Sequence, residues 1–91
     1  MDNRRPIFDV FAQRIPFMIM VELRKTIKPI YSSVLARKVN STYSNTIKTL
    51  KVLENAKLLE FNCKGKLIKT IHLTEKGSKV AEHMEKIKDL L

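Results

Sequence analysis

Apolar positions change their spacing along this chain, and each change predicts a boundary between structural elements. From Pro16 onward, the run PFMIMVELRKTI has a proline in the permitted first turn of a helix and apolar residues almost all round. A helix of that kind is buried on two sides, so in a small chain we expect its second side to lie against a partner subunit. Residues 7–14, which precede it, show only weak helical spacing.

Two more helices are predicted beyond Lys28-Pro29, where the first one stops. Ile30-Tyr31 is a short extended link, and Ser32 or Ser33 is expected to cap a helix over about 33–39. After a break at Asn40-Ser41, another helix covers about 42–57, with apolar positions at helical spacing: Tyr43, Ile47, Leu50, Leu53 and Leu58. We expect Tyr43 to be a core or staple residue, with stacking on a base as the alternative.

Residues 58–73 alternate instead, which predicts a β-hairpin with a basic tip at Lys64-Gly65. Its first strand places Leu59, Phe61 and Cys63 on one side, with Glu60 and Asn62 on the other. Thr74 is expected to cap a last helix, on which Val80, Met84, Ile87 and Leu91 form one apolar stripe.

Helix, short helix, tight break, helix and hairpin follow one another in the order of a winged helix-turn-helix. The fold class expected is therefore α+β, mostly α, with a hairpin wing and flanking N- and C-terminal dimerisation helices. One domain over residues 1–91 is predicted: an N-terminal arm and first helix (1–27), the helix-turn-helix with its wing (28–73) and a C-terminal helix (74–91).

The run YSSVLARKVNSTYSNTIKTLKVLENAKLLEF, followed by KLIKTIHLTEKG, resembles the small winged-helix transcriptional regulators of MarR-like and archaeal single-domain type. The resemblance covers residues 16–91. It implies that SSVLARKV is the support helix, that TYSNTIKTLKVLENAKLL is the recognition helix, and that LTEKG opens the dimer helix. The chain departs from the pattern at Lys57, where the family commonly has glycine before the wing.

Charge is concentrated in the middle of the chain. The protein carries a formal net charge of +9, and residues 28–69 hold nine Lys or Arg against Glu54 and Glu60. Neither Asp nor Glu occurs from Leu23 to Leu53. A charge run is often only a solvated face, but an acid-free stretch across two predicted helices favours an anionic partner, most simply nucleic acid.

The front of the third predicted helix is rich in small polar residues and lacks the usual acidic first turn. With Tyr43, Ile47 and Leu50 taken as the core side, a rotation of about 100° per residue places the opposite side toward solvent. The predicted DNA-contacting residues there are Ser41, Ser44, Asn45 and Lys48, with Thr42 and Thr49 at the margin. Asn45 suits adenine and Lys48 suits guanine or a phosphate, whereas competing Ser and Thr caps are the purely structural alternative.

Further backbone contacts are predicted on either side of that helix. Arg37 and Lys38 end the support helix, while Lys64, Lys66 and Lys69 lie on the hairpin, where they would reach the minor groove or flanking phosphates. The alternative for the hairpin is that its lysines only keep an exposed strand pair soluble.

Other chemistry is not indicated. The sequence contains no phosphate loop, catalytic carboxylate pair or nucleophile motif, so we expect no enzyme activity and no cofactor. His72, His83 and the single Cys63 lack zinc spacing, and a buried thiol is the default for Cys63. Met18, Met20 and Met84 are expected in the core and a subunit interface, with an effector pocket left open. The longest clean apolar run, seven residues, is too short for a membrane span, so a cytoplasmic, nucleoid-associated protein is expected.

The sequence thus predicts a homodimeric, sequence-specific regulator that binds double-stranded DNA, with 42–57 in the major groove and 58–73 on the flanking backbone or minor groove. Dimerisation is expected through Ile7 to Ile27 and Thr74 to Leu91. Two alternatives remain: a protein that binds DNA without sequence preference, as architectural proteins do, and a winged helix that docks an acidic protein partner.

Overall fold

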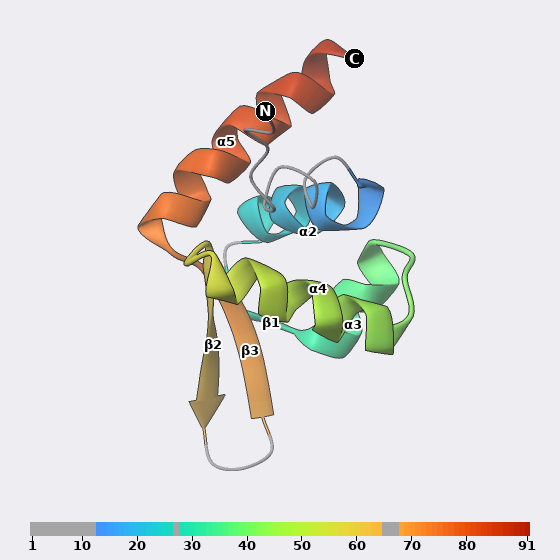
Figure 1. Cartoon of the computed structure of the whole chain (residues 1–91), viewed down its shortest axis with the longest axis vertical. Coiled ribbons are helices and arrows are strands. Elements are labelled where there is room, and N and C mark those ends of the chain that lie inside the picture. Colours follow the sequence, from blue (N-terminus) through green and yellow to red (C-terminus); the bar gives the residue numbers. More distant parts are fainter. Residues whose placement is uncertain (1–12, 27, 65–67) are drawn as a thin grey trace, which may run out of the picture.

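A computed structural model describes residues 13–26, 28–64 and 68–91, with only the backbone described at 63, 64, 68 and 69. The elements of this part of the chain are α2 (Arg14–Lys25), β1 (Ile30–Tyr31), α3 (Ser32–Lys38), α4 (Tyr43–Asn55), β2 (Leu59–Lys64), β3 (Ile68–Leu73) and α5 (Glu75–Leu90). Figure 1 shows α2 between α5 on one side and the α3–α4 pair on the other, with the β2–β3 hairpin projecting away from α5. This element order confirms the fold class predicted from the sequence.

The all-round apolar character of α2 comes from its central position. It contacts α3, α4, α5 and β3, and Ile19, Met20 and Val21 have no exposed surface. The expectation that a partner subunit covers the second side of this helix is wrong for these residues, because other elements of the same chain cover it. Pro16 lies in the first turn, as predicted, where its missing N–H costs the helix no hydrogen bond.

Ser32 and Ser33 do not cap α3, contrary to the prediction. The residue before the helix is Tyr31, which has extended dihedral angles and makes no side-chain cap, and Ser32 is a buried helical residue. The extended link Ile30-Tyr31 is a strand, because it pairs with β3. Helix α3 therefore starts directly from the sheet.

Both helices of the α3–α4 pair end in the same way. After α3, Asn40 has a φ of 56°, and the N–H groups of Asn40 and Ser41 donate to the carbonyls of Arg37 and Ala36. After α4, Lys57 has a φ of 66°, and the N–H groups of Lys57 and Leu58 donate to the carbonyls of Glu54 and Leu53. These are Schellman endings, in which a left-handed residue satisfies the last carbonyls of a helix. The bend at Lys57 is thus made without the glycine that the resembling family commonly has at this position.

The three strands form an antiparallel sheet in the order β1-β3-β2. Leu59 pairs with Leu73 and Phe61 with Ile71, and Leu59 and Ile71 are buried while Glu60 and Asn62 are exposed. The predicted alternation is confirmed for these positions. The turn at residues 65–67 lies outside the described residues.

Thr74 caps α5, as predicted: its Oγ1 accepts a hydrogen bond of 2.9 Å from the Gly77 N–H. The predicted apolar stripe is only partly buried. Met84 is buried and Val80 half-buried, but Ile87 is 50% exposed and Leu91 fully exposed. The inner face instead runs through Gly77, Ala81 and Met84, two of which are too small to show in a hydrophobic pattern.

Candidate nucleic-acid interface

Helix α4 is held to the domain by Thr46, Leu50 and Leu53, which have no exposed surface. Ile47 is half-buried. The Thr46 hydroxyl tolerates burial because it donates a hydrogen bond of 2.8 Å to the carbonyl of Thr42, one turn earlier. Tyr43, expected in the core, is 58% exposed, because the line of core residues passes through Thr46 and leaves the first turn outside. Its ring therefore belongs to the solvent surface at the front of α4.

The predicted residues at the front of α4 bond to one another. Thr42 is the N-cap, and its Oγ1 accepts the Asn45 N–H at 3.1 Å. The Asn45 side chain donates from Nδ2 to Ser41 Oγ at 3.2 Å, and Ser41 Oγ donates to the Thr42 carbonyl at 3.4 Å. An amide nitrogen carries two hydrogens, so Asn45 keeps one donor and its oxygen for an outside partner. The network holds the Asn45 amide in place on an exposed surface.

Ser44, Asn45 and Lys48 are exposed, as predicted. Thr49 is half-buried and its Oγ1 donates to the carbonyl of Asn45 at 2.9 Å, so its hydroxyl hydrogen is used within the helix. Sequence reasoning missed Lys51 and Asn55, which are also exposed. Ser44, Lys48, Lys51 and Asn55 follow one another at intervals of four, three and four residues, and this spacing was the available signal, since it places all four on one face.

That outer face of α4 is free of acids at the end that carries the predicted contacts. The first turn of α4 contains no acidic residue, and neither does that of α3. The N-terminal N–H groups of a helix carry a partial positive charge, which a carboxylate there would neutralise. Polar side chains, Lys48 and the helix end therefore combine into a surface suited to phosphate and base edges.

The flanking basic residues are placed only in part. Arg37 and Lys38 are exposed in the last turn of α3. Lys64 pairs with Ile68, and Lys69 with Cys63, in the β2–β3 register, so both lie at the far end of the hairpin. The side chains of Lys64 and Lys69, and Lys66 altogether, lie outside what the structure describes, as does the Cys63 thiol.

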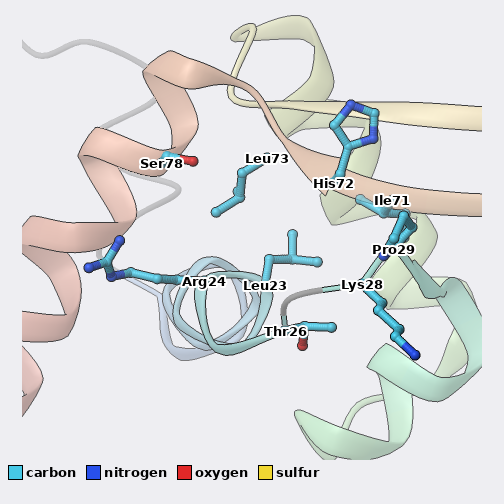
Figure 2. Close-up of a pocket in the computed structure, with 9 residues that line it drawn as sticks. All are labelled: Leu23, Arg24, Thr26, Lys28, Pro29, Ile71, His72, Leu73 and Ser78. Atoms are coloured by element: carbon cyan, nitrogen blue, oxygen red, sulfur yellow. The ribbon is translucent and has the colours of Figure 1, made fainter.

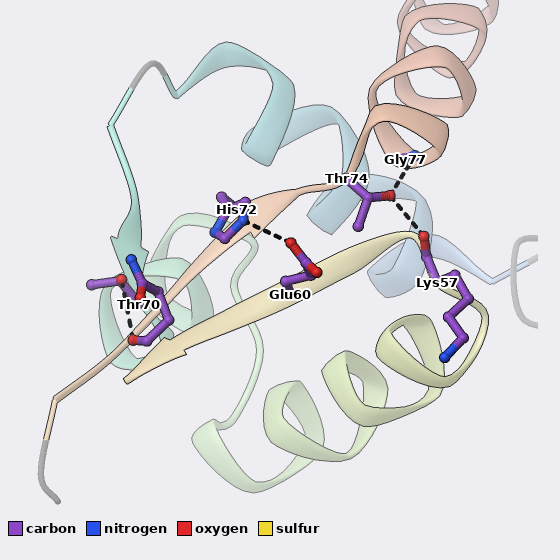
Figure 3. A network of polar contacts seen from close by, with 7 residues as sticks. Lys57, Glu60, Thr70, His72, Thr74 and Gly77 are labelled. Carbon is purple, nitrogen blue, oxygen red and sulfur yellow. Dashed lines mark hydrogen bonds and ion pairs between the residues drawn. The ribbon is translucent and has the colours of Figure 1, made fainter. Parts of the chain in front are cut away.

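The histidines are surface residues. His72 Nε2 lies 3.1 Å from Glu60 Oε1 across the β2–β3 pair (Figure 3). His83 is exposed on α5. Within the described residues, no three His, Cys, Asp or Glu side chains are grouped to hold a metal ion. Every helix in residues 13–26, 28–64 and 68–91 is too short or too polar to span a bilayer.

A groove of about 270 Å³ lies between α2, β3 and the start of α5 (Figure 2). Leu23, Ile71 and Leu73 give it an apolar floor, while Arg24, Lys28 and His72 supply nitrogen atoms around it. Met18, Met20 and Met84 are not among its lining residues, so the methionines that raised the question of an effector pocket do not form this one.

Comparison with known proteins shows which solved structures share this fold. No protein-family model matches the chain. The solved structure of AF1382 from Archaeoglobus fulgidus is 30% identical, with a TM-score of 0.74 over 94% of this chain and 96% of that one. A possible HxlR family transcriptional factor from Thermoplasma volcanium superposes with a TM-score of 0.86 at 16% identity, over 99% of this chain and 82% of its own.

MepR, a transcription regulator of the Staphylococcus aureus efflux pump MepA, superposes with a TM-score of 0.77 at 22% identity, over 86% of this chain. This chain has the winged helix-turn-helix fold.

Other relatives are longer than this winged-helix chain. An uncharacterized protein of Archaeoglobus fulgidus is 37% identical over 62 residues, which are 68% of this chain and 64% of that protein. The match to MepR spans 58% of the MepR chain. In this winged-helix protein, α3 and α4 are the two helices of the helix-turn-helix motif, and β2 and β3 form the wing.

Proposed function

We propose that this winged-helix protein is a transcriptional regulator that binds double-stranded DNA in a sequence-specific manner, with α4 in the major groove. The observation that carries the proposal is the front of α4, where Ser44, Asn45 and Lys48 are exposed without an acid in the first turn. A mutant of MepR in this fold was solved bound to an oligodeoxyribonucleotide; it superposes with a TM-score of 0.77 at 19% identity.

Each part of the surface has its own expected contact. Asn45 suits a bidentate pair with adenine, and Lys48 suits guanine or a phosphate. Thr42, Ser41 and Thr49 support Asn45 and the helix front through the hydrogen bonds described above. The proposed phosphate contacts are Arg37, Lys38 and the wing lysines Lys64, Lys66 and Lys69. Each should add about one unit to the slope of the logarithm of the binding constant against the logarithm of the salt concentration.

A homodimer is part of the proposal. The far end of α5 exposes Ile87, Leu90 and Leu91, which are 50%, 87% and 100% accessible in the single chain. We propose that a second copy covers them and that the two α4 helices of the dimer meet half-sites about one helical turn, roughly 34–36 Å, apart. The N-terminal arm, also expected at this interface, lies outside the described residues up to residue 12. A cytoplasmic location on the nucleoid follows from the proposed function.

Selection of bound sequences from a random duplex pool, followed by affinity measurement at several salt concentrations, tests this function. An enriched inverted repeat with a steep salt dependence is the expected result. Equal affinity for the selected and random duplexes would favour the architectural protein instead. No binding at low salt would leave the protein-interaction module as the better explanation.

Asn45→Ala is expected to relax one base position in each half-site and weaken binding by about 1–3 kcal/mol. Asn55→Ala is the matched control, since it removes the same kind of exposed side chain from the last turn of α4, away from the front that carries the predicted contacts. Lys48→Ala should weaken binding and reduce the salt slope, whereas Lys88→Ala on α5 should change neither. If the two asparagine variants behave alike, the front of α4 is not the recognition surface.

A further inference from the structure

The end of α4 is joined to the start of α5 through three consecutive backbone carbonyls. Lys76 Nζ donates to the Ala56 carbonyl at 3.1 Å, Thr74 Oγ1 to the Lys57 carbonyl at 2.7 Å, and the Thr74 N–H to the Leu58 carbonyl at 3.0 Å. The last carbonyls of a helix and of its closing turn have no donors within the helix, so they need outside partners. Here residues 74–76 supply all three.

Gly77 completes this junction by close approach. A Cβ at position 77 would lie 1.7 Å from the Leu58 carbonyl oxygen, a distance at which the backbone would have to move. The N–H of the same glycine donates to Thr74 Oγ1, which in turn donates to Lys57, as Figure 3 shows. Thr74 thus uses one hydroxyl group to cap α5 and to hold the closing turn of α4.

The two helices meet only at these ends within the described part of the chain: α5 leaves the C-terminal end of α4 and rises away from it (Figure 1). Along its length α5 packs on α2 instead, where Ala81 and Met84 are buried in the core and Arg24 of α2 forms an ion pair with Glu85. The direct link between α4 and α5 is therefore short, polar and confined to residues 56–58 and 74–77.

We propose that this α4–α5 junction fixes the angle between the two helices, with Thr74, Lys76 and Gly77 as positioning residues for α4. The proposal rests on the proposed function for its consequence. In a homodimer held by α5, the junction sets how far apart and at what angle the two α4 helices lie. Because half-sites lie on a rigid duplex, a firm junction makes affinity depend sharply on the spacing between half-sites.

A measurement without DNA tests the junction itself. Spin labels at Lys51→Cys on α4 and Lys88→Cys on α5, in a Cys63→Ser background, report the distance between the two helices by pulsed electron resonance. Labelled protein is diluted into unlabelled protein, so that only distances within one chain contribute. We expect Thr74→Val with Lys76→Met to broaden the distance distribution roughly twofold or to shift its maximum. Thr74→Ser, which keeps the hydroxyl, should retain the narrow distribution.

Lys79→Met is the matched control for Lys76→Met, because Lys79 lies on the same helix but faces Glu75 and not α4. A distribution in the double variant that is as narrow as in the parent protein and has its maximum at the same distance overturns the proposal, whether or not the protein binds DNA. A general loss of structure is recognised separately from the helical circular dichroism signal of each variant.

The second measurement uses duplexes that carry the selected inverted repeat with zero, one or two inserted base pairs. One insertion moves a half-site by about 3.4 Å and a tenth of a turn, so the parent protein should lose about tenfold in affinity or more. In Thr74→Val with Lys76→Met that penalty should fall to about threefold or less, and Thr74→Ser should restore it. An unchanged penalty in the variant contradicts the junction proposal alone, whereas absence of DNA binding by the parent contradicts the proposed function alone.

Discussion

Helices α2 and α5 were both expected to serve a subunit interface, and they differ in what covers them. Helix α2 contacts α3, α4, α5 and β3 of its own chain, and Ile19, Met20, Val21 and Leu23 on it are buried. Among the residues that the structure describes, those of α5 that are buried extend only as far as Met84, and the helix ends in exposed Ile87, Leu90 and Leu91. The apolar sequence of a helix therefore predicts that the helix is buried. It does not predict whether the surface that buries it belongs to the same chain or to a partner.

The largest expected effect comes from breaking the enclosed helix. Met20 has no exposed surface, so Met20→Lys buries a charged group in the core. We expect this to lower the free energy of unfolding by about 3–5 kcal/mol. Ile87→Lys makes a similar change on α5 and should leave the fold within about 0.5 kcal/mol of the parent chain. Thermal unfolding followed by circular dichroism compares them. If the two variants were equally stable, the conclusion that α2 is enclosed by its own chain while the end of α5 is exposed would be wrong.

The covered half of α5 should behave like α2. Gly77→Ala introduces the Cβ that meets the Leu58 carbonyl, and we expect a cost of about 2–3 kcal/mol in unfolding free energy. Ser78→Ala, at the exposed neighbouring position, should cost about 0.5 kcal/mol or less. Urea unfolding curves with unchanged slope provide the measurement. If the Gly77→Ala protein were as stable as the parent, the start of α5 would be able to move away from the Leu58 carbonyl at little cost in free energy.

The exposed half of α5 should affect association and not folding. Ile87→Glu with Leu90→Glu is expected to weaken a homodimer by about 10- to 100-fold, or roughly 1.4–2.8 kcal/mol, without unfolding the single chain. Lys86→Ala with Lys88→Ala changes the net charge equally in the same turns and serves as the control. Sedimentation velocity over a range of concentrations measures both. An unaltered dimer would move the interface to another part of the chain.

The smallest effect is expected at the polar link between the two helices. Arg24 Nε lies 2.9 Å from Glu85 Oε1, and both side chains remain about one third exposed. Such a pair contributes about 0.2–1 kcal/mol, so Arg24→Met should lower stability by less than about 1 kcal/mol, and less again at high salt. Lys25→Met, the exposed neighbour, is the control. A loss above about 2 kcal/mol would make this pair a main attachment of α5.

Much of the fold was predictable because the residues that the spacing of apolar positions assigns to the core are mostly the residues that are buried. The period of two over residues 58–73 gave the hairpin, and Leu50 and Leu53 gave the inner face of α4. The core position of Thr46 was not predictable from hydropathy, since its burial depends on a hydrogen bond to its own helix. That bond displaced the inner face by one residue and left Tyr43 outside.

The candidate site was predictable as a surface but not as a set of contacts. Exposure of Ser44, Asn45 and Lys48 follows from the helical period once Leu50 is inside. The mutual bonds of Ser41, Thr42 and Asn45 depend on side-chain rotamers at the cap, which spacing alone does not specify. Gly77 and Ala81 were missed because small residues carry no hydrophobic signal, although they determine how closely α5 approaches its neighbours.

The junction between Lys57 and Thr74 also has a consequence for the order of folding. These residues are 17 positions apart, and the whole hairpin lies between them. Their contacts cannot form until β2 and β3 have brought the two ends together, so they belong to the late side of the folding barrier. Interactions that form late slow unfolding and leave the folding rate nearly unchanged. One threonine hydroxyl at the foot of the wing therefore acts on the lifetime of the folded protein more than on the speed of its formation.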